Sequence, residues 1–159
     1  MAYNVDEIFE IAEQIERNGA AFYRKAASFS HADARDFLLD LAHQEDEHER
    51  TFAGLRADLV AAPKKVANYD QDDIVASYLR ALAGQYVFHK NRKPQDVLSG
   101  KESLPDILTL AIQQEKDSIV LYLGLMDTLA DSGDRDKVRR ITKEEQQHLT
   151  DLLEKQRAL

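Results

Sequence analysis

The sequence predicts an all-α fold, a four-helix bundle of two antiparallel helix hairpins with an additional helix in the long crossover. Glycine and proline are sparse, at six and three of 159 residues, and no stretch alternates apolar and polar residues as a half-buried strand would. Apolar residues instead recur at helical spacing in five segments, which are separated by polar or by glycine- and proline-containing breaks. The expected helices cover residues 5–28, 32–59, 71–88, 104–129 and 134–156.

Local signals set the ends of the first two helices. Asn4 and Glu7 have the spacing of a capping box at the start of the first helix. A polar break at residues 28–31 separates this helix from the second one, which Pro63 ends. Because the break is short, the two helices are expected to form an antiparallel hairpin.

The second half of the chain is expected to form another hairpin after a long connection. A shorter helix at residues 71–88 is followed by a basic loop at residues 89–101. Ser103 is the expected N-cap of the next helix, and Pro105 lies in its first turn, where proline is tolerated. Gly133 breaks the chain before the last helix. Two hairpins joined by one long crossover form a known four-helix bundle topology.

Length and charge narrow the class of protein. At 159 residues, the chain can bury a sizeable core and is expected to form one domain over residues 1–159. A formal net charge of −8 and an isoelectric point near 5.1 argue against nucleic acid or an anionic membrane surface as partner. The chain lacks an apolar run of about 18 residues and the apolar core of a signal peptide. We therefore expect no membrane-spanning helix and a cytoplasmic location.

One pattern of residues occurs twice in the chain. Each copy has a Glu, a Tyr seven positions later and a Glu-x-x-His motif about 30 positions downstream: Glu16, Tyr23, Glu45 and His48, then Glu115, Tyr122, Glu145 and His148. A Glu and a His three positions apart lie on one face of a helix, where both can bind one metal ion. A lone Glu-x-x-His is more often a surface ion pair, but its repetition with matching upstream residues favours a metal site.

The apolar pattern predicts that these carboxylates lie inside the bundle. At about 100° per residue, Glu16 falls at the centre of an apolar stripe that contains Phe9 and Ala12. Glu115 shares its helix face with Leu108 and Ile119. The two Glu-x-x-His motifs occupy positions that the periodicity of their helices reserves for leucine.

Buried carboxylates need a source of positive charge. Each one left unpaired would cost several kcal/mol, and no Lys or Arg lies on these stripes. Two divalent cations would balance the four negative charges; the alternative is a set of protonated carboxyl groups with raised pKa values. The oxygen and nitrogen donors suit iron or manganese, and six ligands for two metals leave positions open for O2, peroxide or water. Because the chain has no cysteine, redox chemistry would depend on such a centre.

Other residues near the motifs are open to more than one interpretation. Tyr23 and Tyr122 lie on the same helix faces as Glu16 and Glu115, so each could pack in the core or hydrogen-bond to a ligand carboxylate. Glu144 lies beside Glu145 in sequence but off its helix face, as Glu47 and Glu49 do beside His48, which favours solvent-exposed charge.

The pattern resembles the ferritin-like di-iron carboxylate proteins over nearly the whole chain. Its segments are most similar to the rubrerythrin-like group, in IERNGAAFY, LAHQEDEHERTF and IQQEKDSIVLY. The resemblance implies two iron ions per chain. Glu45 and Glu145 would bridge the two ions, Glu16 and Glu115 would be terminal ligands, and His48 and His148 would each bind one iron. It also implies reaction with hydrogen peroxide or O2 in a homodimer or larger homo-oligomer.

The chain departs from the resembled proteins in three ways. Rubrerythrins carry a rubredoxin-like domain whose iron is held by cysteines. This chain has no cysteine for such an iron site, so electrons are expected from a separate donor protein. Peroxidase-type members have an additional Glu ligand at the position that Ser118 occupies here. Because serine has no carboxylate, this chain lacks the ligand that peroxidase turnover in those members uses. Bacterioferritins have a haem-binding Met at the position of Asp46, so no haem is expected here.

These observations predict a non-haem di-iron oxidoreductase that reduces hydrogen peroxide or reacts with O2 in oxidative-stress defence. The alternative is a ferroxidase or iron-storage protein of the ferritin-like type, which oxidises Fe(II) without turnover on another substrate. A dimanganese site similar to that of manganese catalases is a third interpretation, because manganese accepts the same donors as iron.

Overall fold

The computed structural model describes residues 5–62, 74, 77–79, 81–82 and 96–159. Most of this part consists of four long helices, α1 (Val5–Ser28), α2 (Ala32–Ala61), α4 (Leu104–Met126) and α5 (Ser132–Arg157). The described residues form no β-strand. The predicted all-α class is therefore confirmed, and each long helix coincides with a predicted one to within a few residues.

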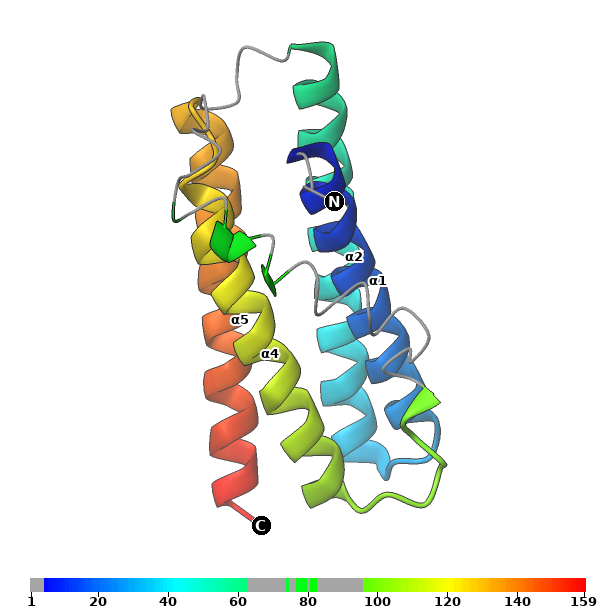
Figure 1. Cartoon of the computed structure of the whole chain (residues 1–159). Coiled ribbons are helices and arrows are strands. Elements are labelled where there is room, and N and C mark those ends of the chain that lie inside the picture. The colour runs from blue at the N-terminus through cyan, green and yellow to red at the C-terminus, as the bar shows by residue number, and fades with distance from the viewer. Residues whose placement is uncertain (1–4, 63–73, 75–76, 80, 83–95) are drawn as a thin grey trace.

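The helices form a four-helix bundle of two antiparallel hairpins (Figure 1). α1 packs along α2 and α4 packs along α5, while α1 also contacts α4 and α2 contacts α5. The turn between α1 and α2 lies at one end of the bundle, and the turn between α4 and α5 lies at the other (Figure 1). Because α2 ends and α4 begins at opposite ends, the connection between the hairpins has to cross the length of the bundle. This is the predicted one-crossover topology.

Part of the predicted crossover helix is described, and its residues are helical: 74, 77–79 and 81–82. Among them, Leu79 is fully buried in the core of the bundle. The remainder of the helix predicted at residues 71–88, most of the basic loop after it and the predicted cap residue Asn4 lie outside the described residues.

The ends of α4 and α5 are set by capping side chains. Ser103 caps α4 as predicted: its hydroxyl accepts a hydrogen bond from the Asp106 backbone N–H (3.4 Å), and the Asp106 carboxylate accepts one from the Ser103 N–H (3.0 Å). The predicted start of α5 is wrong by two residues. Asp131 is its N-cap and accepts from the Asp134 N–H at 3.0 Å. Gly133 therefore lies in the first turn of α5 and does not break the chain.

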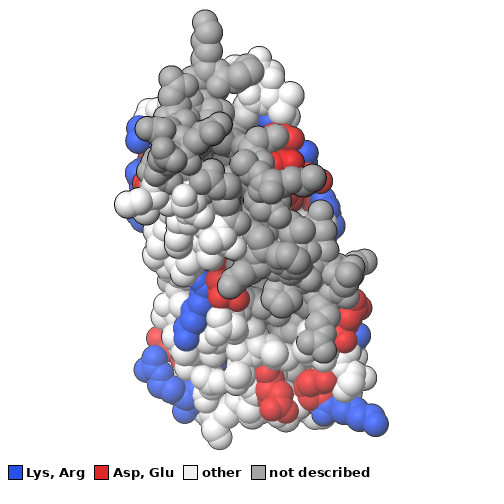
Figure 2. All heavy atoms as spheres, in the orientation of Figure 1, with Lys and Arg blue, Asp and Glu red and all other residues white. Residues whose placement is uncertain are grey.

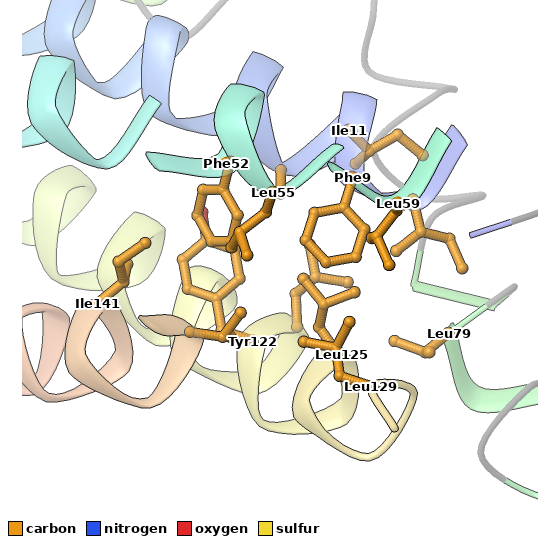
Figure 3. Close-up of a cluster of buried hydrophobic side chains, with 14 residues drawn as sticks. Phe9, Ile11, Phe52, Leu55, Leu59, Leu79, Tyr122, Leu125, Leu129 and Ile141 are labelled. Atoms are coloured by element: carbon orange, nitrogen blue, oxygen red, sulfur yellow. The ribbon is translucent and has the colours of Figure 1, made fainter. Parts of the chain in front are cut away.

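The core consists of two apolar clusters with a polar layer between them. The first apolar cluster includes Phe9, Phe52, Leu55, Tyr122, Leu125 and Ile141 (Figure 3). The second apolar cluster includes Phe22, Leu38, Leu41, Leu108, Ala111 and Leu152. Each fully buried Leu or Phe contributes about 1.5–3 kcal/mol to folding, so the clusters provide the main stabilisation at both ends. On every helix, the predicted metal-ligand positions lie between residues of these two clusters.

The surface of the bundle carries charges of both signs. On the face shown in Figure 2, acidic and basic side chains are interspersed. Arg56 on α2 pairs with Asp6 on α1 at 2.6 Å, but both side chains are partly exposed, and such surface pairs contribute about 1 kcal/mol or less. No helix in the described part of the chain is long and apolar enough to cross a lipid bilayer.

Gly124 allows the crossover to approach α4 closely. A Cβ atom at this position would lie 2.7 Å from Cε1 of Tyr78 and 3.1 Å from Cδ2 of Leu79. The Tyr78 hydroxyl also donates a hydrogen bond to the Val120 carbonyl of α4 at 3.1 Å. By contrast, a Cβ at Gly54 on α2 would meet no described atom within 4 Å.

These two glycines provide a matched test of the contact between the crossover and α4. Gly54→Ala is expected to raise the free energy of unfolding by about 0.5–1 kcal/mol, because alanine has the higher helix propensity. Gly124→Ala is expected to lower it by about 1 kcal/mol, since the overpacking cost exceeds the same gain in propensity. Urea unfolding followed by circular dichroism measures both changes. Equal stabilisation by the two substitutions would show that the crossover does not pack against Gly124.

Candidate metal centre

The structure brings the six predicted ligand residues together in the polar layer between the two apolar clusters. Each of the four long helices contributes one glutamate, and α2 and α5 each add a histidine one turn later. Each residue is at most 5% exposed: Glu16, Glu45, His48, Glu115, Glu145 and His148. The prediction that these polar residues take core positions is therefore confirmed, because the flanking residues of the same helix faces are apolar and equally buried.

The donor atoms of these residues form two overlapping groups. Within each group, one donor atom per residue lies within 4.8 Å of all the others: Glu16, Glu45, His48 and Glu145 in the first, and Glu45, Glu115, Glu145 and His148 in the second. Glu45 and Glu145 belong to both groups. The two imidazole rings are nearly parallel, at an interplanar angle of 22°, with their centroids 5.7 Å apart.

Two tyrosines connect α1 and α4 through Glu16 and Glu115, the two glutamates that belong to only one donor group each. The Tyr122 hydroxyl donates a hydrogen bond to Oε1 of Glu16, and the Tyr23 hydroxyl donates one to Oε1 of Glu115. Both tyrosines therefore pack in the core and also hydrogen-bond to a carboxylate. Burial, with the nearby carboxylates, holds the pKa of both phenols well above the ordinary value, so both remain protonated donors.

Each imidazole presents Nδ1 to the carboxylates and Nε2 to a side chain outside the layer. Nδ1 of His48 lies 2.8 Å from Oε1 of Glu145, and Nδ1 of His148 lies 3.0 Å from Oε2 of the same residue. On the outer side, Nε2 of His48 lies 2.7 Å from Oε2 of Glu144, and Nε2 of His148 lies 3.0 Å from Oε1 of Gln44.

Sequence reasoning missed these two outer partners. Glu144 had the pattern of a surface charge, and its side chain is indeed 46% exposed, but its carboxylate reaches His48 of the other hairpin. Gln44 was not a candidate at all. Their common signal is position, because each directly precedes the glutamate of a Glu-x-x-His motif.

The geometry of the layer fits a pair of bound cations. Three of its buried carboxylate oxygens make no well-formed hydrogen bond among the described residues, although an imidazole Nδ1 lies within 3.4 Å of each: Oε2 of Glu16, Oε1 of Glu45 and Oε1 of Glu145. Buried anionic oxygens are costly unless a proton, a hydrogen-bond donor or a metal ion compensates them. Gly19 adds to the fit, because a Cβ there would lie 3.1 Å from Oε2 of Glu45 and would crowd this carboxylate.

Without a metal, the layer holds protons tightly. Burial and the neighbouring carboxylates raise the pKa of Glu45 well above its ordinary value and that of Glu145 to about 8. Burial alone would lower the pKa of the histidines, but adjacent carboxylates outweigh it and raise the pKa of His48 to about 11 and of His148 to about 10. Burial also opposes ionisation of Glu115, but the imidazole of His148 lowers its pKa overall. A metal ion would therefore have to displace protons on binding.

These pKa shifts predict that the metal-free protein loses stability as pH rises. Because the pKa of Glu145 is raised from 4.5 to about 8, the folded state loses stability relative to the unfolded state as pH rises through this range. The stabilisation from the charged histidines is likewise lost as pH rises from 6.5 to about 10 for His148 and to about 11 for His48. Both effects act between pH 6.5 and 8. Thermal unfolding in excess chelator should thus show a falling Tm over this range, and Glu145→Gln should flatten the fall. A constant or rising Tm in the wild-type protein would contradict the proton assignment.

Comparisons with known proteins agree with this architecture. No protein-family profile and no curated protein sequence matches the chain. A solved crystal structure from Thermotoga maritima, of a protein assigned as a ferritin-like diiron-carboxylate protein, is similar with a TM-score of 0.70 and 28% sequence identity. The similarity covers 98% of this chain and 96% of the other. The chain therefore has the ferritin-like diiron-carboxylate fold, with a buried carboxylate and histidine layer at its centre.

Proposed function

We propose that the buried layer binds two iron ions and that the protein is a rubrerythrin-like, non-haem di-iron oxidoreductase reducing hydrogen peroxide or O2. The observation that carries this proposal is the pair of overlapping donor groups that share Glu45 and Glu145. Two carboxylates common to two groups are what a pair of adjacent, bridged metal ions requires. The similarity to a ferritin-like diiron-carboxylate protein supports iron over other metals.

Each metal position takes its own glutamate and histidine besides the shared pair. Position 1 consists of Glu16 and His48, and position 2 consists of Glu115 and His148, each with Glu45 and Glu145. Four carboxylates carry the negative charge that two divalent cations neutralise. The oxygen-rich donor set also accepts manganese, which is the alternative metal.

The residues around the positions prepare the layer for reaction with a small oxidant. Two Fe(II) ions bound there would supply one electron each, so that hydrogen peroxide takes up two electrons and two protons and becomes two molecules of water. The apolar clusters limit water around the layer, which strengthens electrostatic interactions inside it. Tyr23 and Tyr122 hold the terminal carboxylates in place. Because the chain has no cysteine, a separate electron-transfer protein is proposed to return the electrons.

One observation favours the alternative of a ferroxidase or iron-handling protein. Ser118 lies one turn after Glu115, is buried, and donates its hydroxyl hydrogen bond to the Gln114 carbonyl of its own helix at 3.1 Å. It therefore offers no carboxylate to position 2. Without an additional carboxylate there, iron could be oxidised and passed on as cargo, with no turnover on a second substrate.

Anaerobic Fe(II) binding tests the metal site. The wild-type protein is expected to take up about two iron ions per chain, since two donor groups are present. Glu45→Ala and Glu145→Ala should each abolish the pair, because both residues belong to both groups. Glu47→Gln is the matched control, because this side chain on α2 is 60% exposed and pairs with His43, away from the layer. Iron content after gel filtration gives the result. A wild-type protein that retains no iron would refute the proposal.

Stopped-flow oxidation of the Fe(II) form distinguishes the two functions. The proposed oxidoreductase should be oxidised by peroxide or O2 and should turn over repeatedly when an electron-donor protein and NAD(P)H are added. Iron should stay at about two per chain in a small oligomer throughout. A large hollow assembly by light scattering, loaded with hundreds of iron ions, would instead establish the storage function.

A further inference from the structure

The two metal positions differ in the side chain that contacts the outer nitrogen of each histidine. The ligand groups match in kind: each position has a glutamate bound by a tyrosine, a histidine and the shared pair of glutamates. Outside them, Nε2 of His48 meets the Glu144 carboxylate at 2.7 Å, whereas Nε2 of His148 meets the Gln44 amide oxygen at 3.0 Å. Glu144 and Gln44 hold the same place in the two copies of the repeated pattern.

The hydrogen-bond network fixes the direction of both contacts. The Gln44 side-chain N–H donates to Oδ2 of Asp40 at 3.0 Å, so its oxygen is turned toward His148 and accepts from the ring Nε2–H. The Glu144 carboxylate can only accept, so Nε2 of His48 is the donor there as well. Both rings therefore keep Nε2 protonated and direct Nδ1 toward the metal positions.

The charge behind the two rings is not equal. A full negative charge on Glu144 lies in direct contact with the His48 ring. At His148, the negative charge belongs to Asp40 and is separated from the ring by the length of the Gln44 amide. Coulomb energy falls with distance, and a carboxylate on the outer nitrogen makes an imidazole a stronger metal ligand than a neutral amide does. The 46% exposure of the Glu144 side chain screens this difference without removing it.

We propose that the two metal positions are unequal and fill in order, position 1 at His48 before position 2 at His148, because Glu144 supports the first histidine and Gln44 the second. This inference rests on the proposed two-metal site. Glu144 and Gln44 act as positioning residues, since each acts through a histidine without contacting the metal. The consequence is a protein that holds one ion firmly and exchanges the other more readily.

Manganese titration of the full-length protein tests the order of filling, because Mn(II) accepts the same donors as iron without being oxidised by air during the measurement. Isothermal titration should resolve a tight and a weaker step, and the electron paramagnetic resonance spectrum should change from an isolated ion at one equivalent to a coupled pair at two. Anomalous scattering from crystals loaded with one equivalent should place the ion at His48.

Exchanging the outer partners should shift the two steps separately. Glu144→Gln should weaken the tight step about tenfold and leave the second unchanged, and adding Gln44→Glu to it should move the first ion to His148. Glu154→Gln, which removes an exposed charge elsewhere on α5, should change neither step. Equal occupancy in the wild-type protein, or an order that survives the exchange, would overturn the inference while leaving the two-metal site intact. Absence of any manganese or iron binding by the wild-type protein would refute the proposed function itself.

Discussion

Four buried glutamates repel one another in a single layer, and the bundle around them has to accommodate that repulsion. Glu16, Glu45, Glu115 and Glu145 occupy one layer, each at most 5% exposed. Such a layer is compatible with a folded bundle only if protons or cations neutralise it. The raised pKa values of Glu45 and Glu145 favour the protonated form of both carboxyl groups when no metal is bound. Oε1 of each of these two residues makes no well-formed hydrogen bond among the described residues and is an atom that a metal ion would bind.

The other parts of the bundle make this polar layer tolerable and fix its geometry. The apolar clusters on either side contribute the burial that offsets its cost. In the first cluster, the rings of Phe9 and Phe52 make an edge contact (Figure 3). Tyr23 and Tyr122 each donate a hydrogen bond across the interface between the hairpins, to Glu115 and Glu16 respectively. Stability and the positions of the candidate ligands are thus provided by the same helix faces, because each of the four long helices passes through one cluster, the layer and the other cluster.

Much of this arrangement could be predicted because helical periodicity is a local property. A Glu-x-x-His motif in place of core leucines indicates a buried polar face, and a pattern repeated in register indicates that the faces meet. The start of α5 was predicted wrongly, since Gly133 weakens a helix but the Asp131 cap decides where it begins. Glu144 was beyond prediction for a different reason. Its partner His48 belongs to the other hairpin, and its one sequence signal, a position directly before the glutamate of a Glu-x-x-His motif, does not show whether a half-exposed carboxylate reaches across.

We propose that cations and protons compete for the same buried layer. Counting the protons released when the metal-free protein binds Mn(II) or anaerobic Fe(II) tests it most directly, by calorimetry at pH 7 in buffers of different ionisation enthalpy. We expect uptake of metal with net release of protons, because the histidines and Glu145 hold protons at that pH in the metal-free protein. Metal uptake without proton release would contradict it.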